Sequence, residues 1–377
     1  MRELFIHEFH KTHGNLTEFA GFQIPLWYEG VIPEHMAVRE NVGLFDTSHM
    51  GRAIIAGKNS AEFLDYVTSR DPSNLNPFQG QYSTICNIKG GIIDDLTVYN
   101  LEDNYLIVYN AANRIKDFKW LVSHAADFDV EVKDVSDETC MFALQGPKAD
   151  FTLQKLVNNE LHKIRRYWVE WLEIGGLKAL VMKSGYTGEN GFEIIVFNVT
   201  IANPKDALKL WHSLLKAGKE SQIKPCGLGA RDSLRLEAGM CLYGNELTEE
   251  ITPFEAKIDF VVKLSKEDFI GRSALAKQNE RGVTKIRIGL KMVDPGIPRQ
   301  GYAIISGKKK VGFVTSGGFS PLLKCGIAMG YVPPNLSHEG TCLNIEVRKK
   351  KLEAEVIKMP FYNVDSYGWK RKLVDSS

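Results

Sequence analysis

The sequence lacks several features that would place it in a well-marked class of proteins. Its six cysteines are far apart and form no C-x-x-C pair. This argues against zinc binding and favours free thiols in a reducing compartment. Lysine and arginine number 47 against 46 acidic residues, for a net charge of +1. A balance this even offers no broad electrostatic surface to nucleic acid or membrane, so neither is an expected partner.

Long apolar runs are missing as well. No stretch reaches the roughly 18 apolar residues that a transmembrane helix needs. The first residues carry acids and histidines instead of an apolar or Arg- and Ser-rich leader. We therefore expect a cytoplasmic protein. Its 377 residues, 44% of them hydrophobic, suffice for two or three globular domains.

Two polar clusters near the N-terminus have the residue types of a reactive site without its pattern. His7, His10 and His13 recur at helical spacing. No carboxylate or companion motif joins them, so a polar helix face is favoured over a metal site. The Asp-Thr-Ser-His run at 46–49 resembles the parts of a hydrolase triad. However, no G-x-S-x-G elbow is present, and adjacent strand residues point to opposite faces.

Residues 79–110 show three strand patterns separated by turns, with an Asp pair in the second. Alternation places Asp94 with the most apolar neighbours and Asp95 on the opposite face. One acid therefore faces the interior whichever face is buried. A buried carboxylate has a raised pKa that suits acid–base chemistry. The alternative is that both acids lie at a solvated strand end after the Gly90-Gly91 turn.

A glycine-rich stretch at 184–194 ends in an acid at the mouth of an apolar strand. Three glycines in seven residues allow positive φ and a close approach of the backbone to another group. Glu193 needs a partner there, such as an Arg or a flat ring with adjacent N–H donors. Arg231 and Arg235 lie on one face of a predicted helix and are candidates. A hairpin with a solvated acid and a surface helix are equally open interpretations.

The last quarter of the chain has a different pattern. From residue 285 onward, short strands alternate with Gly, Pro and Lys turns. This predicts a barrel or sandwich of about 90 residues. A charged segment at 263–281 looks like the joint to it. The Pro-rich loop at 294–299 presents Arg299 from a stiff turn.

Together these stretches identify a family. The chain resembles, from end to end, the aminomethyltransferase (T-protein) family of the glycine cleavage system. The matching motifs are collinear and lie at 19–22, 44–50, 90–96, 144–147, 185–193, 230–239, 242–245, 314–317 and 328–333. Phe22 stands where the family usually has Trp.

The resemblance implies an α+β fold, a three-domain cloverleaf around a central folate channel. Antiparallel sheets with flanking helices would be followed by a C-terminal jelly-roll β-barrel. Residues 1–50 and 138–265 would form a discontinuous first folate-binding domain, and 51–137 an inserted α+β domain carrying the Asp pair. Residues 280–377 would form the barrel domain.

The resemblance also implies a reaction. The family moves the one-carbon unit from the aminomethyl-lipoyl arm of a carrier protein, the H-protein, to tetrahydrofolate and releases ammonia. Tetrahydrofolate would be the co-substrate, with no metal and no flavin. Asp95 would be the catalytic acid, Glu193 would hold the pterin and Arg231 would neutralise that carboxylate. The other expected folate-site residues are Met50, Tyr82 and Tyr367 beside the rings, Asn110, Tyr186, and Arg299 at the channel entrance.

One conflict accompanies this assignment, because alternation alone favours Asp94 as the buried acid. A β-bulge after Gly90-Gly91 would reconcile the two. Two other functions on the same fold stay open. One is a folate-dependent demethylase, although its oxidative forms carry a flavin domain too large for this length. The other is a non-enzymatic folate-binding iron–sulfur assembly factor, whose K-G-C-Y-x-G-Q-E motif has a cysteine that is missing at 184–189.

Overall fold

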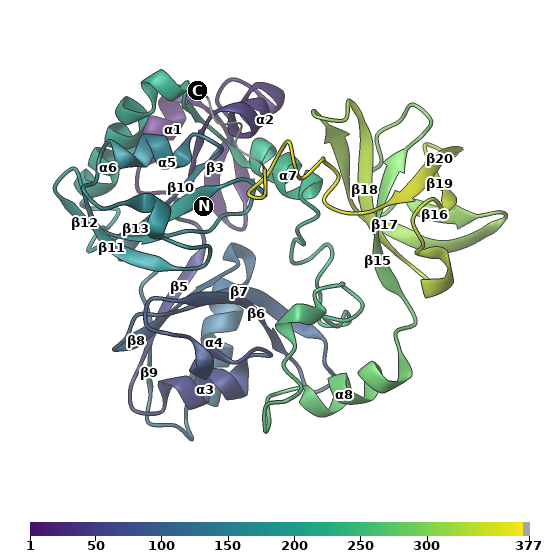
Figure 1. Ribbon diagram of the computed structural model, residues 1–377, viewed down its shortest axis with the longest axis horizontal. Helices are drawn as coiled ribbons and strands as arrows, with labels where there is room; N and C mark the ends of the chain where they lie inside the picture. The colour runs from purple at the N-terminus through teal and green to yellow at the C-terminus, as the bar shows by residue number, and fades with distance from the viewer. Residues whose placement is uncertain (372–377) are drawn as a thin grey trace.

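The computed structural model describes residues 1–371 of the chain. Three lobes meet around the centre of the molecule: two contain open sheets with helices, and the third is a β-barrel (Figure 1). The predicted three-lobed α+β fold with a C-terminal barrel is confirmed. No helix within the described residues is long and apolar enough to cross a membrane.

The first lobe is built on a six-stranded sheet in the order β11-β12-β13-β10-β4-β14. All neighbours are antiparallel except β14 and β4. The strands are β4 (Gly43–Asp46), β10 (Thr139–Gln145), β11 (Val169–Ile174), β12 (Leu177–Met182), β13 (Gly191–Phe197) and β14 (Lys224–Pro225). Every residue of the central strand β10 is buried. Its sequence therefore does not alternate between apolar and polar, because both of its faces are covered.

Helices and a small sheet cover this lobe. The helices are α1 (His7–His13), α2 (Val31–Glu40), α5 (Ala149–Gln154), α6 (Lys205–Ala217) and α7 (Leu228–Glu237). Helix α6 buries Ala207, Leu210, Trp211 and Leu214, an i, i+3, i+4, i+7 stripe that packs into the main core. The small sheet joins β1 (Arg2–Glu3), β3 (Phe22–Trp27) and β2 (Asn15–Phe19) in that order.

The second lobe carries the Asp pair. Its sheet has the order β6-β7-β8-β5-β9, with helices α3 (Ser60–Val67) and α4 (Arg114–His124). The strands are β5 (Gly51–Ala56), β6 (Gly80–Cys86), β7 (Ile92–Asn100), β8 (Asn104–Tyr109) and β9 (Glu131–Asp134). Ile85 pairs with Asp94, whereas the next residue, Cys86, pairs with Ile92. Ile93 is thus the extra residue of a bulge, which lies after Gly90-Gly91 but before Asp94, so the alternation of Asp94 and Asp95 along β7 is unchanged.

The third lobe is a closed barrel in the order β15-β18-β17-β16-β19-β20. Its strands are β15 (Ile286–Met292), β16 (Ala303–Ser306), β17 (Lys309–Ser320), β18 (Cys325–Val332), β19 (Cys342–Val347) and β20 (Lys350–Ile357). Strand β20 is not among the predicted strands, because its lysines at 350 and 351 resemble a turn. Leu352, Ala354 and Val356 nevertheless alternate toward the barrel core.

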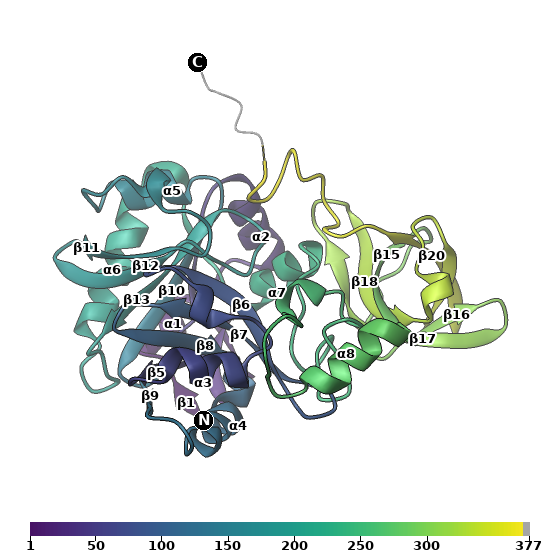
Figure 2. The same cartoon turned by 60° about the horizontal axis from the view of Figure 1, so that its bottom comes forward.

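Two connections tie the lobes together. Helix α8 (Arg272–Arg281) precedes the barrel, within the charged segment predicted as a joint. After β20 the chain returns to the first lobe (Figure 2). There the amide of Phe361 donates to the Glu237 carbonyl over 2.8 Å, and that of Gly368 to Oε1 of Glu189 over 3.0 Å. The domain boundaries expected from the sequence remain a prediction.

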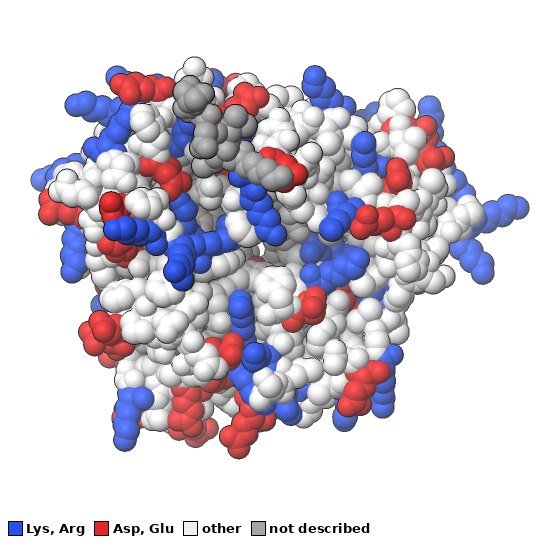
Figure 3. Space-filling model, viewed as in Figure 1, with Lys and Arg blue, Asp and Glu red and all other residues white. Residues whose placement is uncertain are grey.

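Short 3-10 helices complete the described part of the chain. They lie at Pro72–Asn74, Ala111–Asn113, Leu161–Lys163, Lys219–Ser221, Asp259–Val261 and Pro334–Leu336. The molecular surface is hollowed near the centre of the face in Figure 3, with basic side chains beside the hollow. The three lobes meet near the centre of the molecule, and residues of all three line the site described next.

Candidate functional site

A cavity of about 350 Å³ lies between the lobes. Its volume is in the range of small-molecule sites. Strands of both open sheets, the segment after α7 and the first barrel strand contribute to its wall. Seven of the nine predicted site residues line it: Met50, Tyr82, Asp95, Asn110, Tyr186, Glu193 and Arg231. Arg299 and Tyr367 are not among the lining residues.

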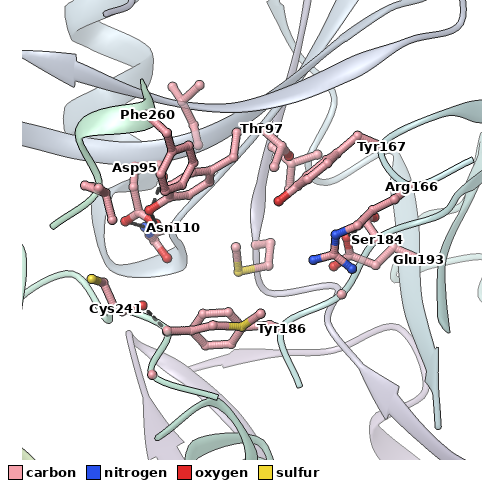
Figure 4. A pocket seen from close by; sticks show the side chains of 18 of the residues that line it. Asp95, Thr97, Asn110, Arg166, Tyr167, Ser184, Tyr186, Glu193, Cys241 and Phe260 are labelled. Atoms are coloured by element: carbon pink, nitrogen blue, oxygen red, sulfur yellow. Dashed lines mark hydrogen bonds between the residues drawn. The ribbon is translucent and has the colours of Figure 1, made fainter. Parts of the chain in front are cut away.

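Asp95 forms one end of this cavity (Figure 4). Its carboxylate accepts hydrogen bonds from the Tyr82 hydroxyl over 2.9 Å and from Nδ2 of Asn110 over 2.7 Å. Burial raises the pKa of Asp95 well above its ordinary value, and the negative charge of Asp94 raises it further. The two hydrogen bonds act in the opposite direction, because they stabilise the ionised form. The carboxyl group is therefore suited to exchanging a proton near neutral pH.

Asp94 lies behind Asp95 and is completely buried. It accepts hydrogen bonds from the backbone N–H of Asn110, from Nδ2 of Asn110 over 2.9 Å and from Nδ2 of Asn113 over 2.8 Å. The alternation of apolar residues and the family match thus point to different acids because the two acids have different positions. Asp94 is the interior acid, as the apolar pattern predicts, and Asp95 is the acid that faces the cavity. The solvated strand end considered for both acids is wrong.

Glu193 forms the opposite end of the cavity (Figure 4). Its Oε2 accepts a hydrogen bond from the Ser184 hydroxyl over 2.6 Å. Burial raises the pKa of Glu193, while that hydrogen bond and the charges of Arg231 and Arg166 oppose the rise. One carboxylate oxygen is thus held by the protein, and the group faces a space lined by further polar and aromatic side chains. A ligand with N–H donors would complete its hydrogen bonding.

The two arginines of α7, Arg231 and Arg235, have different neighbours. Arg231 lines the cavity, with its guanidinium 4.8 Å from the ring centroid of Tyr186, and among the described residues it forms no ion pair. Burial lowers the pKa of Arg231, and the negative charge of Glu193 opposes this shift. Arg235 instead binds Glu246 over 3.0 Å and Asp232 over 2.7 Å. Arg235 does not line the cavity that holds Glu193, but both arginines line the adjoining cavity described below, so their meeting a common anion stays a prediction.

The backbone of the glycine-rich stretch packs closely against the side chain of Gln145. A Cβ at Gly185 would lie 1.9 Å from Oε1 of Gln145, and one at Gly191 would lie 2.4 Å from Nε2 of the same side chain. Gly188 has φ +80°, next to Tyr362. These glycines let the segment fold over Gln145, which donates to the carbonyl of Ser184 over 3.0 Å. Ser184 and Glu193 are placed at the cavity as a consequence.

Several lining residues were not predicted from the sequence. They are Leu96, Thr97, Val108, Arg166, Tyr167, Ser184, Gly185, Gly239, Met240, Cys241, Lys257, Ile258, Phe260 and Arg287. Ser184 and Gly185 lie in a stretch that was singled out for Glu193. Arg166 and Lys257 carry the positive charge that the even overall composition conceals. Neither lies in a periodic pattern, so no sequence signal indicates them.

A second cavity of about 410 Å³ adjoins the first. Both are lined by Met50, Asn110, Tyr186 and Arg231, so these side chains stand between two chambers. The second chamber is also lined by Asn245, whose Oδ1 accepts a hydrogen bond from Gln300 over 3.1 Å. Arg299 precedes Gln300, which places it on a loop beside the second chamber. Tyr367 lies against Tyr362, with ring centroids 6.5 Å apart, and its contact with folate stays a prediction.

Comparison with known proteins identifies this arrangement. Residues 6–266 match the family model described as the GCVT N-terminal domain. Residues 285–363 match the glycine cleavage T-protein C-terminal barrel domain. The chain belongs to the glycine cleavage T-protein family.

Individual members of the T-protein family agree over nearly the whole chain. An aminomethyltransferase of Clostridium botulinum (strain Kyoto) is 46% identical over 352 residues, which is 93% of this chain and 94% of that protein. One from Alkaliphilus metalliredigens is 44% identical, covering 95% of each. The crystal structure of the glycine cleavage system aminomethyltransferase T from Bartonella henselae superposes with a TM-score of 0.89 at 34% identity, covering 98% of this chain and 99% of that one. The prediction of an aminomethyltransferase is confirmed.

The two polar clusters near the N-terminus have structural roles in this T-protein family member. Asp46 accepts a hydrogen bond from the amide of Ser48 over 2.9 Å and contacts Nε2 of His10 over 3.0 Å. The Ser48 hydroxyl donates to the Met141 carbonyl, so no serine–histidine pair forms. Within residues 1–371, no group of three or more His, Cys, Asp or Glu residues is arranged to hold a metal ion.

Proposed function

We propose that the first cavity binds tetrahydrofolate and that Asp95 is the catalytic residue of the aminomethyl transfer. The observation that carries this proposal is the placement of two carboxylates, Asp95 and Glu193, at opposite ends of one cavity (Figure 4). One end offers an acceptor for a ring bearing N–H donors. The other offers a titratable group for the reacting amines.

The residues fit a reduced folate. Its pterin presents an amino group and a ring N–H that can donate to the carboxylate of Glu193, whose Oε1 is free and whose Oε2 has a further lone pair. Tyr82, Tyr186 and Met50 supply aromatic and thioether surfaces for flat rings. Arg231 would seat the folate next to Glu193. The basic residues Lys257 and Arg287 line the same cavity and suit the glutamate carboxylates of a folate, whereas Arg166 lies at the Glu193 end.

The transfer balances without an oxidant. The methylene carbon exchanges its bonds to the lipoyl sulfur and to the amino nitrogen for bonds to two folate nitrogens. The two folate N–H protons leave, one with ammonia and one with the lipoyl thiol. The products are ammonia, dihydrolipoyl carrier protein and 5,10-methylenetetrahydrofolate. Protein groups must therefore move protons and stabilise a transient cation.

Asp95 is suited to both tasks. As a carboxylate it accepts the proton of an attacking folate amine and stabilises the positive charge that develops as ammonia leaves. Because its pKa is raised, the protonated Asp95 can readily pass this proton on to the departing ammonia or lipoyl thiol. Asn110 and Tyr82 hold the carboxylate in place, and Asn110 orients nearby groups.

The partner in this proposal is the lipoylated H-protein. We assign its aminomethyl-lipoyl arm to the second cavity, because that chamber adjoins the first one through Met50 and Asn110. Arg299 lies on the neighbouring loop and would meet the arm or its carrier. A cytoplasmic location fits the six free cysteine thiols and belongs to the same proposal.

The test combines the purified protein, tetrahydrofolate and an aminomethyl-loaded lipoyl carrier protein. Ammonia and methylenetetrahydrofolate should appear together in equal amounts. A matched reaction with unmodified carrier protein should give neither product. Tight folate binding without either product from the loaded carrier would overturn the proposal and favour a demethylase or an assembly factor.

A further inference from the structure

The end of the described chain, after the barrel, packs on the glycine-rich stretch of the first lobe (Figure 2). The amide of Trp369 donates to the Gly188 carbonyl over 2.9 Å. Two residues later, the Arg371 side chain forms an ion pair with Glu189. The chain end is therefore fixed against the segment that leads to Glu193.

A glycine makes this close packing possible. Gly368 has φ +84°, a left-handed conformation that favours glycine. A Cβ at this position would lie 2.9 Å from the Tyr362 hydroxyl oxygen and 3.0 Å from the Gly188 carbonyl oxygen. The turn at Gly368 brings the next residue, Trp369, onto the first lobe, where it stays 43% exposed. Because Trp369 is this exposed, a substitution there should leave the fold intact.

The indole of Trp369 lies against Arg166. The guanidinium carbon of Arg166 is 4.8 Å from the ring centroid of Trp369 and 5.2 Å from that of Tyr167. Both distances are typical of cation–π contacts. Within residues 1–371, the Arg166 side chain forms no hydrogen bond or ion pair. The two rings therefore fix the position of this guanidinium.

Arg166 stands at the Glu193 end of the first cavity. It lines the cavity together with Ser184 and Glu193, and Figure 4 shows its guanidinium beside these two side chains. In the described part of the chain, Arg166 and Glu193 form no ion pair with each other, so both keep hydrogen-bonding capacity for a ligand. A donor beside an acceptor matches one edge of a pterin, which carries a carbonyl oxygen next to its ring N–H and amino group.

The backbone at Arg166 joins the two lobes with open sheets. The amide of Tyr167 donates to the Lys183 carbonyl over 2.9 Å, and the Tyr167 carbonyl accepts from the amide of Gly80 on β6 over 2.6 Å. Tyr167 has φ +63°, which is uncommon for a residue with a Cβ. The second lobe thus fixes the backbone of this turn, whereas the segment after the barrel fixes the side chain that reaches the cavity.

We propose that Trp369 is a positioning residue of the folate site: its ring holds the Arg166 guanidinium beside Glu193, where Arg166 donates to the carbonyl oxygen of the pterin. The inference rests on the proposed function. It adds two residues that no sequence motif indicated, and one of them, Trp369, lines neither cavity. The segment after the barrel therefore completes the Glu193 end of the site without touching the ligand.

The first test compares two substitutions of the ring. Trp369→Leu removes the aromatic face, whereas Trp369→Phe keeps a smaller one. In the leucine variant, KM and the dissociation constant for tetrahydrofolate should rise about fivefold, as expected for one cation–π contact, while kcat stays unchanged. The phenylalanine variant should remain within about twofold of the parent. As a control, Phe151→Leu removes an exposed ring from the cation–π pair with Lys155 on α5 and should leave KM unchanged.

Arg166 supplies the second comparison. Arg166→Met should weaken folate binding at least as much as Trp369→Leu does. Adding Trp369→Leu to it should cause no further loss, because the ring then has no guanidinium to hold. Additive losses in the double variant would overturn the proposal, as would parent-like affinity in either single variant. A fall in kcat with unchanged KM in Trp369→Leu would mean general structural damage and would also overturn it.

Tryptophan fluorescence tests the contact without folate. Arg166→Met should change the emission of the parent protein but not that of Trp369→Phe, because the indole in contact with Arg166 is that of Trp369. An equal change in both backgrounds would overturn the proposal. A parent protein that binds no tetrahydrofolate, yet shows the emission difference, would count against the proposed function alone.

Discussion

The Tyr82 hydroxyl donates a hydrogen bond to Oδ2 of Asp95 over 2.9 Å. The two residues are diagonal neighbours on adjacent strands, because Tyr82 pairs with Thr97 and Asp95 pairs with Thr84. Diagonal positions on one face of a sheet are within reach of a long side chain. The antiparallel register of β6 and β7 therefore orients the proposed catalytic carboxylate.

Loss of the Tyr82 hydroxyl should raise the pKa of Asp95. The hydrogen bond stabilises the ionised acid, so Tyr82→Phe removes a group that opposes the upward shift. A hydrogen bond to a charged group contributes about 1.5–3 kcal/mol, or roughly one to two pKa units. The acid limb of the pH–rate profile should move to higher pH. A limb that stays in place would show that Asp95 does not control it.

Asp95→Asn should abolish turnover and leave folate affinity nearly unchanged. The amide keeps the shape of the side chain but cannot accept a proton. Turnover is followed by methylenetetrahydrofolate formation, and folate affinity by calorimetry. Asp103→Asn, at an exposed position before the next strand, is the matched control and should behave like the parent. Activity equal to the parent in Asp95→Asn would refute the catalytic role.

Glu193→Ala should weaken folate binding by about 2 kcal/mol or more, because a charged acceptor is lost. Isothermal calorimetry with tetrahydrofolate measures this directly. Ser184→Ala should have a smaller effect, since Ser184 holds one oxygen of Glu193 and does not replace it. Glu173→Ala, at an exposed position on β11, controls for the loss of one negative charge. Unchanged affinity in Glu193→Ala would remove Glu193 from the folate site.

His49 should make the fold sensitive to acid. Burial, together with the positive charge of Arg231, lowers the pKa of His49 to about 3. The unfolded chain binds a proton at this position near pH 6.5, so stability falls as pH drops from there toward 3. At pH 5 the loss is about 2 kcal/mol. In His49→Phe, denaturant unfolding at pH 7.5 and 5 should show a pH-dependent loss smaller by this amount. An equal loss in both proteins would contradict the assignment.

Arg39 should be among the most costly side chains to truncate. It is completely buried and binds Glu189 over 3.0 Å and Glu237 over 3.1 Å. Arg39→Met leaves both carboxylates without this partner, which typically destabilises by about 3–5 kcal/mol. Lys133→Ala breaks an exposed pair with Glu138 and should cost at most about 1 kcal/mol. Urea unfolding of both variants checks the contrast, and similar losses in the two would contradict it.

The sequence by itself determined most of the elements, the barrel and the family. These features depend on local information: alternation, turn residues and collinear motifs. It also indicated that one acid of the pair is interior. Both the apolar pattern and the family match were right, because adjacent residues of a strand face opposite sides, with Asp94 inward and Asp95 toward the cavity.

Only the tertiary structure decided which distant groups meet. Arg166 and Lys257 come from irregular segments, and their presence at the first cavity depends on how the lobes pack. The sequence pattern places Arg235 on the same helix face as Arg231, yet Arg235 forms an ion pair with Glu246. Which charged groups meet depends on their separation in space, which local sequence does not encode.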